Sequence, residues 1–435
     1  MQLFKAASLL LWLSSLAIVI ATPTSAGEVQ SMGPKGSDEL AIATNHLIDS
    51  IRDSAKLVED DPFYRDPENR AAGISYLNAM IFRTIEEDIL LDRDFPYFSV
   101  MDFRSREGGD NPDQRYLYSQ IRGGKSYRIW GRMGKDQVGM EFEVLKGYPW
   151  VPNSNSRTVA TLDTKDLKIG KDGTFEVILS PSRQAGNWIE NPVDADRVLL
   201  RQTYSKWTNA RPGEVHIDPL GEEGNLKPRL TDAEMVRRLN LAANNLLHNV
   251  VPAYPAMVRR NNVEKIPANT LPAKPYSAVA NGGPKGRYYS SGHFDLRPDQ
   301  ALLITEWPIS SCYYQGIQLT NLWWSSIEYA NRQSSLSRDQ AYLSTDGAYH
   351  FVVSAADPGV QNWLDTGGFK QGIVMLRMDC ADLGAFPAGK EPTARVVDLP
   401  DVLKSLPGNT PRVMPEARKA EIAARRKAIQ IRSGL

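Results

Sequence analysis

The pattern of hydrophobic and polar residues predicts a pair of helices near the start of the chain. Over Ser37–Asp60, apolar residues return at steps of three and four, which is the period of one helix face. Ser37-Asp38-Glu39 supplies a cap and an acidic first turn, and Asp61-Pro62 ends the pattern. The same period recurs from about Asn69 to Leu91. Because the connection between the two segments is short, we expect an antiparallel pair of helices.

Two series of short segments with a period of two predict β-strands after these helices. The first series is Tyr97–Phe103, Tyr116–Arg122, Ser126–Gly131, Gln137–Val144, Arg157–Asp163, Thr174–Leu179 and Arg197–Tyr204. The second series is Tyr288–Phe294, Ala301–Trp307, Tyr313–Leu319, Gln340–Leu343, His350–Ser354, Gly372–Met378 and Arg395–Asp398. Strands this short, separated by turn clusters, favour antiparallel sandwiches over a parallel sheet with crossover helices.

The stretch between the two series contains a linker and a further helix. Arg211–Pro228 resembles a linker, and Thr231-Asp232-Ala233-Glu234 then forms a capping box at the start of a long amphipathic segment. We expect Pro252 to end that helix and Ile266–Gly286, rich in Pro and Gly, to form a loop. The two halves of the chain therefore share a rhythm of helices followed by strands.

A last, basic helix is predicted over Pro415–Ile431. Its alternating charges favour a solvated face over a surface for membranes or nucleic acid. The predicted fold class is α+β, with two antiparallel β-sandwich (jelly-roll-like) units, each preceded by helices. The predicted domains are residues 27–210, a connecting region at 211–287, and residues 288–435 with the basic helix at the end.

Composition limits the classes of partner. The chain has 435 residues, with 51 Lys plus Arg and 51 Asp plus Glu, so no bulk field attracts nucleic acid or an acidic polymer. The histidines form no zinc-binding pattern, and Gly124-Lys125-Ser126 lacks the earlier glycine of a phosphate-binding loop. We therefore predict no nucleic-acid partner, no metal and no cofactor. The oligomeric state is not predicted.

Residues 1–26 have the organisation of a secretory signal. Lys5 precedes an apolar run over Ala6–Ala21, and Thr24-Ser25-Ala26 resembles a cleavage site before Gly27. The alternative is an uncleaved anchor, but the run is shorter than the roughly 20 residues of a spanning helix. The sequence thus predicts export to the periplasm or outside the cell, without stable membrane insertion after cleavage.

Cys312 and Cys380 are the two cysteines of the chain. In an oxidising compartment they could form a disulfide, and two buried thiols are the alternative. Their spacing alone does not decide between these arrangements.

The candidate binding site lies in the second series, over Tyr313–Ser335 and Asp357–Gly368. Both segments combine tryptophans with polar side chains that a core strand does not require. The predicted ligand-binding residues are Asn321, Trp324, Arg332, Gln333, Asn362, Trp363 and Asp365. The alternative is a core covered by tryptophan, in which Arg332 pairs with Asp357 or Asp365.

Three functions remain open from these residues. The first is a module that binds a carbohydrate or another small amphipathic ligand. The second is an enzyme, a lyase or an isomerase, in which Arg332 neutralises an anionic group and His293 or Tyr289 moves a proton. The third is a structural role in the cell envelope. The enzyme requires His293 or a tyrosine close to Arg332, whereas the binding module requires only an open cleft.

Several long segments resemble one bacterial family. NLWWSSIEYANRQSSLS, DPGVQNWLDTGG, Pro415-Glu416-Ala417-Arg418 and NPDQRYLYSQIRGGKSYRIWGRMG are similar to proteins that carry domain of unknown function 1214. The resemblance covers most of the chain after residue 26 and is strongest over Tyr288–Arg432. It implies an α+β fold with β-sandwich parts and assigns no activity or catalytic residue.

Overall fold

The computed structural model describes residues 38–148, 156–281, 283–380 and 389–433. The predicted signal sequence lies outside these residues. Glu39–Leu435 forms one compact unit. Within the described part of the chain, no helix is both long and apolar enough to span a membrane.

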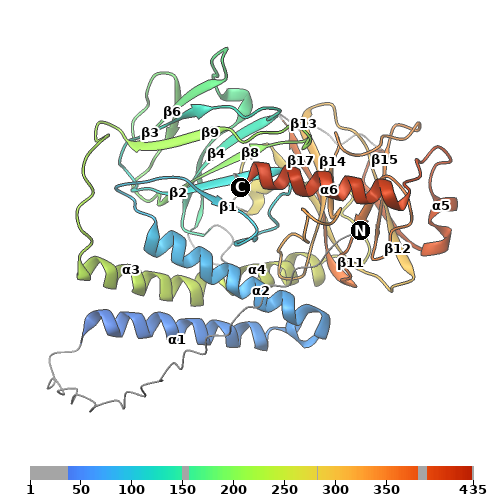
Figure 1. The fold of residues 1–435 in the computed structure, drawn as a ribbon, viewed down its shortest axis with the longest axis horizontal. Helices are drawn as coiled ribbons and strands as arrows, with labels where there is room; N and C mark the ends of the chain where they lie inside the picture. The colour runs from blue at the N-terminus through green and yellow to red at the C-terminus, as the bar shows by residue number, and fades with distance from the viewer. Residues whose placement is uncertain (1–37, 149–155, 282, 381–388, 434–435) are drawn as a thin grey trace, which may run out of the picture. The chain divides into compact units, whose positions relative to one another are not determined.

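A helical layer precedes and separates the two sets of strands. It consists of α1 (Glu39–Asp60), α2 (Pro67–Thr84), η2 (Ile85–Leu90), α3 (Asp232–Asn245), η4 (Leu246–Val250), α4 (Ala253–Val258) and η5 (Arg259–Val263). Figure 1 shows α1, α2 and α3 side by side. Thr231 caps α3 by accepting a hydrogen bond from the Glu234 N–H at 3.2 Å, as the capping box predicts.

The helical run that begins with α3 ends at Val250, two residues before Pro252, as predicted, and α4 follows immediately. Pro252 precedes the first residue of α4 with φ −77° and ψ −16°. A proline fits the start of a helix because its missing N–H would have no partner there. The residue thus separates two helical segments that continue one another.

The first sandwich contains nine strands in two sheets. They are β1 (Ser99–Met101), β2 (Gln114–Gln120), β3 (Tyr127–Arg132), β4 (Gly139–Lys146), β5 (Arg157–Leu162), β6 (Thr174–Ser180), β7 (Asn187–Glu190), β8 (Arg197–Thr203) and β9 (Glu214–Pro219). One sheet has the order β1-β2-β8-β4-β5 and the other β7-β6-β3-β9. The predicted linker therefore contains β9, whose pairing with β3 gives these residues their strand conformation.

The second sandwich has the same organisation. Its strands are β10 (Tyr276–Ser277), β11 (Arg287–Asp295), β12 (Gln300–Glu306), β13 (Cys312–Thr320), β14 (Ser335–Ser337), β15 (Tyr349–Ser354), β16 (Trp363–Asp365), β17 (Gln371–Cys380) and β18 (Thr393–Asp398). The sheets have the orders β10-β11-β17-β13-β14 and β16-β15-β12-β18. The strand predicted over Gln340–Leu343 is wrong; these residues form a turn with a single bridge from Leu343 to Tyr349.

The two sandwiches are topological copies of one another. Raising each strand number of the first sandwich by nine gives the strand order of the second in both sheets. Even the two parallel pairs correspond, β6 with β7 and β15 with β16. All other pairings among the named strands are antiparallel. The predicted α+β class with two mainly antiparallel sandwiches, each preceded by helices, is confirmed.

The core of each sandwich lies between its two sheets. Phe142 and Leu200 are buried in the first core, and Phe351 and Leu376 in the second. Cys312 on β13 and Cys380 on β17 are joined by a disulfide between neighbouring strands. Trp323 packs under the helices, where its indole Nε1 donates to the Asn69 carbonyl at 3.0 Å.

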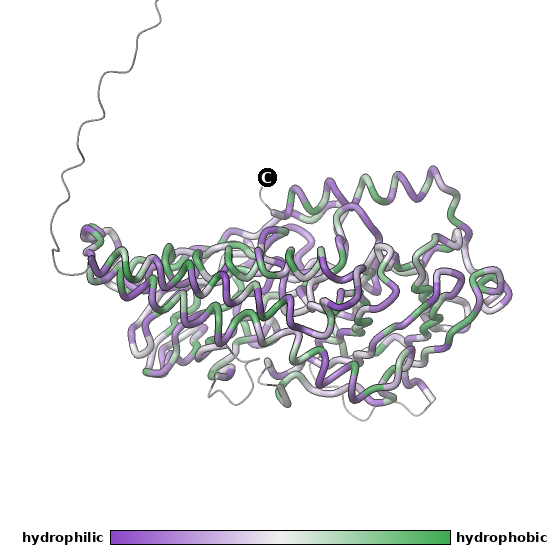
Figure 2. The backbone as a smooth tube through the Cα atoms, turned by 90° about the horizontal axis from the view of Figure 1, so that it is seen from below, coloured by the Kyte–Doolittle hydropathy of each residue, from purple (hydrophilic) through white to green (hydrophobic). Residues whose placement is uncertain are grey.

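Short helices complete the fold. They are η1 (Pro62–Arg65), η3 (Thr164–Asp166), η6 (Ala278–Asn281), η7 (Leu399–Asp401), α5 (Val402–Ser405) and the longer α6 (Pro415–Arg432). Figure 2 shows hydrophilic and hydrophobic positions alternating along α6 beside the C-terminus. The prediction of a solvated basic face is only half right for this helix, because Arg418, Arg425 and Arg432 are buried.

Candidate functional site

A cavity of ≈120 Å³ lies between the outer face of the β2-β8-β4 sheet and the outer face of the β11-β17-β13 sheet. On β8, Val198 and Leu200 point into the first core, so their neighbours Arg197, Leu199 and Arg201 face the other way and line the cavity. On β17 the same alternation directs Met375 and Arg377 to the cavity. The polar side of each strand thus faces a second sheet rather than water.

Direct contacts join the two sheets across this region. The Arg287 guanidinium from β11 lies 3.1 Å from the Glu141 carboxylate of β4. The Arg377 Nη1 from β17 donates to the Tyr116 hydroxyl of β2 at 3.3 Å. These contacts place the cavity between the two copies of the sandwich.

Aromatic and basic side chains dominate the cavity wall. The aromatic residues that line it are Tyr116, Tyr118, Tyr148, Tyr254, Tyr276, Tyr289 and Trp324. The arginines are Arg83, Arg197, Arg201, Arg287 and Arg377, and the carboxylates are Glu87, Glu107 and Asp110. Helix α2 and its extension η2 supply Arg83 and Glu87. The composition of the wall suits a molecule with an apolar body and a negative charge.

Four of these arginines lie next to carboxylates. Arg83 and Arg197 share Glu87, at 2.8 Å each. Arg201 lies 2.8 Å from Glu143 and 3.3 Å from Glu141. Arg287 pairs with Asp379 at 2.7 Å and with Glu141. Burial raises the pKa of Glu141, although both neighbouring arginines work against this effect.

Arg377 differs from the other four because no carboxylate in the described ranges lies within ion-pair distance of it. Its side chain is buried, with the residue 4% exposed. Its Nη2 donates to the Gly109 carbonyl at 2.8 Å, and its Nε has no hydrogen-bond partner. A buried guanidinium without a counterion is costly, since a buried charge is normally paired.

The topological copies explain how this difference arises. Tyr116 pairs with Arg201 across β2 and β8, and Tyr289 pairs with Arg377 across β11 and β17. The guanidiniums stand 5.5 Å and 5.3 Å from the ring centroids of these tyrosines. Arg201 and Arg377 therefore occupy the same position in the two sandwiches.

The third strand breaks this equivalence. Glu141 on β4 is opposite Arg201, and Glu143 is the next outward-facing residue. The corresponding residues of β13 are Gly316, which is opposite Arg377, and Gln318. A Cβ at Gly316 would lie 2.3 Å from the Tyr314 hydroxyl, so even alanine would displace its neighbours. The second copy thus keeps the arginine and has neutral residues where the first has two carboxylates.

The loop beside Arg377 holds an uncommon backbone conformation. Trp324 has φ 57°, a left-handed value that a bulky residue rarely adopts. Its carbonyl accepts from the Gly109 N–H at 2.8 Å, and Gly109 itself has φ 63°. A Cβ on Gly109 would come within 2.6 Å of the Trp324 indole nitrogen. Strained residues of this kind gather at functional sites, where the surrounding structure holds them.

One further polar group in the cavity lacks a hydrogen-bond partner. The Tyr148 hydroxyl is buried and forms no hydrogen bond within the described residues. The Glu107 carboxylate, in contrast, forms an ion pair with Arg83. Buried polar atoms are normally satisfied, so the Tyr148 hydroxyl is available to a bound molecule.

The structure does not bring the seven predicted ligand-binding residues together. Trp324 alone lines the cavity. Asn321 accepts from the Trp323 and Ser325 N–H groups, which makes it a turn residue. Asn362 forms two hydrogen bonds with the Tyr342 backbone.

The remaining members also stabilise local structure. The Gln333 amide donates to the Trp363 carbonyl at 2.7 Å, and the Trp363 indole donates to Ser354. Arg332 pairs with Asp365 at 2.7 Å, as the alternative interpretation predicts. Ligand binding by these residues stays an untested prediction, but their contacts are those of turns and strand ends.

The predicted catalytic candidates are also separated. Tyr289 lines the cavity, whereas His293 and Arg332 do not. His293 is largely buried on β11, its Nδ1 has no partner, and burial lowers its pKa. The described residues contain no group of three His, Cys, Asp or Glu side chains that could hold a metal ion.

Arg377, Arg201 and Tyr116 were not among the residues that the sequence indicated. The available signal was an arginine within an otherwise apolar strand, as in RVLLRQT and GIVMLRMDC. Such a residue also occurs on the solvated face of a half-buried strand, so the signal has two meanings.

The fold and the cavity define a protein with two copies of one β-sandwich and an arginine-rich cavity between them. No protein-family model and no curated protein matches the chain. A crystal structure of an uncharacterized protein from Burkholderia cenocepacia is similar over 83% of this chain and 99% of that one, with 27% identity and a TM-score of 0.73. A Vibrio parahaemolyticus protein aligns over 83% of this chain and all of its own, with 12% identity and a TM-score of 0.43. The resemblance to the domain of unknown function 1214 stays a prediction.

Proposed function

We propose that the protein binds a small amphipathic carboxylate in the cavity between the two sandwiches. The observation that carries this proposal is the buried guanidinium of Arg377, which lines an aromatic cavity without a carboxylate partner. A ligand carboxylate would supply the missing counterion and accept charge-assisted hydrogen bonds. The unpaired charge favours an anion over a neutral sugar.

The dimensions of the cavity support a small ligand. A volume of ≈120 Å³ is close to that of engineered cavities that hold one benzene molecule, about 150 Å³. Tyr289, Tyr116 and Trp324 supply flat apolar surfaces around the charge. Benzoate and short-chain fatty acids combine these properties.

Isothermal titration calorimetry with benzoate and hexanoate tests the proposal. Benzamide and hexanol, which match them in shape but carry no charge, are expected to bind more weakly. The Arg377→Met variant is expected to bind the carboxylates about 10- to 100-fold more weakly, since a hydrogen bond to a charged group contributes about 1.5–3 kcal/mol. It is expected to be at least as stable as the parent, because an unpaired buried charge is removed.

Arg332→Ala is the matched control. Its guanidinium is 47% exposed, pairs with Asp365 and lies outside the cavity, so the variant is expected to bind like the parent. Equal affinity of charged and uncharged ligands would contradict the proposal. So would loss of binding in Arg332→Ala but not in Arg377→Met, which would favour the site indicated by the sequence.

Turnover of the same ligand is the second candidate function. Glu107, which forms an ion pair with Arg83, and Tyr289 line the cavity that holds Arg377. A base and a hydroxyl beside an anion-binding arginine are the groups that a lyase or an isomerase needs for proton transfer. Proton NMR of hexanoate in D₂O distinguishes the two functions: loss of its α-proton signal by exchange with deuterium indicates proton transfer, and an unchanged spectrum indicates binding alone.

We also propose that the protein is exported. The signal-like residues 1–26 and the disulfide between Cys312 and Cys380 support this proposal, because disulfides persist in oxidising compartments. N-terminal sequencing of the secreted or periplasmic fraction is expected to begin at Gly27. An intact N-terminus in the cytosolic fraction would contradict it.

A further inference from the structure

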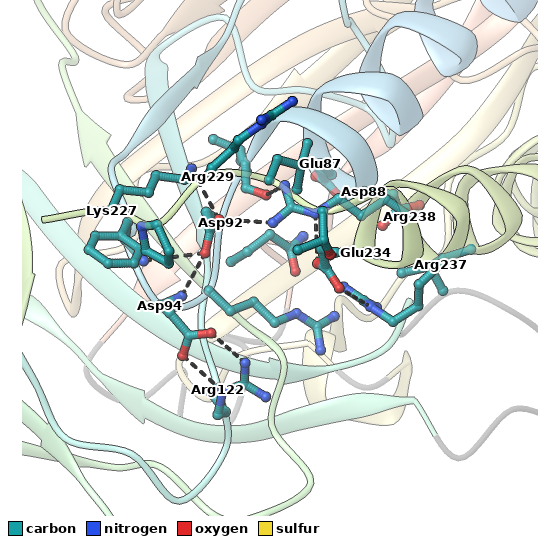
Figure 3. Close-up of a pocket in the computed structure, with 18 residues that line it drawn as sticks. Glu87, Asp88, Asp92, Asp94, Arg122, Lys227, Arg229, Glu234, Arg237 and Arg238 are labelled. Atoms are coloured by element: carbon teal, nitrogen blue, oxygen red, sulfur yellow. Dashed lines mark hydrogen bonds and ion pairs between the residues drawn. The ribbon is translucent and has the colours of Figure 1, made fainter. Parts of the chain in front are cut away.

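A second, larger cavity lies outside the site already described. It has a volume of ≈560 Å³, within the roughly 300–1,000 Å³ of usual ligand pockets. Residues of η2, the chain after it, the end of β2 and the start of α3 line this cavity, here called the α3 groove (Figure 3). It is rich in charges of both signs.

Most charges of the α3 groove are already paired. Asp92 lies 3.0 Å from Lys227 and 2.8 Å from Arg238, and Asp94 pairs with Arg122. Figure 3 shows these pairs along the wall, together with those of Glu234. The pairs hold the wall in place and leave little free charge on it.

Two oppositely charged groups, one buried and one half-buried, lack an ionic partner within the described residues, as does the exposed Arg229. The Arg93 guanidinium has no hydrogen bond or ion pair within the described part of the chain, and burial lowers its pKa. Asp88 accepts from the Asn245 amide at 2.9 Å, but no cation among the described residues lies within ion-pair distance of it. Burial raises the pKa of Asp88 to about 6, as expected for a carboxylate without a cation. Arg93 and Asp88 also lie too far apart to pair with each other.

A third group in the groove is an unused acceptor. Gln120 is 3% exposed at the end of β2, and its side-chain oxygen is buried without a donor. A bound molecule with an N–H or O–H group could satisfy it. The apolar residues Leu91, Phe95, Leu230 and Leu241 line the same groove.

We infer that the α3 groove binds the zwitterion of an α-amino acid with an apolar side chain. The ligand carboxylate would lie against Arg93, and its ammonium would lie against Asp88 and the Gln120 oxygen. The leucines and Phe95 would contact the side chain. A simple anion would leave Asp88 without a cation and the Gln120 oxygen without a donor, and a simple cation would leave Arg93 without an anion.

Thermal-shift and calorimetric titrations with L-leucine and L-phenylalanine test this inference. Each amino acid is compared with its amide, which lacks the carboxylate, and with the corresponding 2-hydroxy acid, which lacks the ammonium. Both analogues are expected to bind at least about tenfold more weakly, because each leaves either the half-buried Arg93 or the buried Asp88 without an ionic partner. Equal binding of the 2-hydroxy acid, or no binding of either amino acid at 10 mM, would overturn the inference.

Variants assign the two ends of the ligand. Arg93→Gln is expected to bind acid and amide equally, and Asp88→Asn to bind amino acid and 2-hydroxy acid equally. Arg237→Gln is the control, because Arg237 is 54% exposed and already paired with Glu234. Retained discrimination in both Arg93→Gln and Asp88→Asn would overturn the assignment. Arg377→Met should leave amino-acid binding unchanged, so the two sites can fail independently.

Discussion

At the scale of single residues, the residue on the neighbouring strand decides whether a buried ionisable group has a counterion. Arg201 and Arg377 have equivalent positions and equivalent tyrosine partners, yet only Arg201 has carboxylates on the neighbouring strand. The difference between a structural ion pair and the proposed anion site thus depends on Gly316 and Gln318. A glutamate in place of Gln318 would change the charge balance around Arg377 without changing the fold topology.

Glu306 is another buried ionisable group without a counterion. The side chain is buried at the end of β12, where the Gln315 amide donates to it at 3.1 Å, and burial raises its pKa to about 8. The folded protein therefore keeps this proton up to about pH 8, whereas the unfolded chain loses it near the ordinary value of 4.5. Stability is expected to fall as the pH rises from about 4.5 to 8.

The Glu306→Gln variant is expected to remove this dependence. At pH 8 it should be more stable than the parent by roughly 2–4 kcal/mol, and at pH 4.5 the two should be nearly equal. Urea unfolding of both proteins between pH 4.5 and 9 measures the difference. A constant difference across this range would mean that Glu306 is not the titrating group.

At the scale of elements, α6 shows how a helix can be both basic and buried. Arg418, Arg425 and Arg432 recur every seven residues, which places them on one face. Arg418 pairs with Asp357 at 2.9 Å, and Arg425 donates to the Tyr329 carbonyl at 3.1 Å and the Ser335 hydroxyl at 3.0 Å. The other basic residues of the helix, such as Arg426, are exposed. One stripe of α6 thus attaches the helix to the second sandwich and, through Pro112 and Trp207, to the first.

Arg425→Ala is expected to destabilise the protein by about 2–4 kcal/mol. The substitution leaves two buried acceptors without a donor and removes the contact with the Trp207 ring, whose centroid lies 4.3 Å from the guanidinium. The neighbouring variant Arg426→Ala removes the same charge from an exposed position and is expected to change stability by about 0.5 kcal/mol or less. Urea unfolding at pH 7 compares them. Equal losses of unfolding free energy in the two variants would show that net charge, rather than these contacts, explains how the arginines of α6 affect stability.

At the scale of the whole molecule, duplication creates the candidate site. Each sandwich buries one face of its sheets in its own core, and the outward faces of the two equivalent sheets then meet. The residues at this meeting, such as Tyr116, Arg201, Tyr289 and Arg377, are the repeated positions of the two copies. Small differences between the copies, rather than a separate loop or insertion, give the cavity its unpaired arginine.

The local patterns of the sequence were sufficient for the main elements. The three-and-four period marks α1 and α2, the capping box marks α3, and the period of two marks β2, β8, β11 and β17. The sequence did not predict several of the shortest strands, among them β10, β14 and β16, because two or three residues are too few to show a period. It did not predict β9 because the proline and glycine around this strand indicated a linker.

The sequence by itself determined the main elements, the fold class and the alternation of faces along the longer strands, since these depend on neighbouring residues. Only the tertiary structure decided which polar faces meet water and which meet each other. The hydrogen bond from Arg377 to Tyr116 joins residues 261 positions apart. A period of two shows that a side chain lies on one face, but the partner across that face comes from a distant part of the chain. For this reason the sequence indicated the tryptophan-rich segment as a site, whereas the arginines of the cavity are evident only in the folded protein.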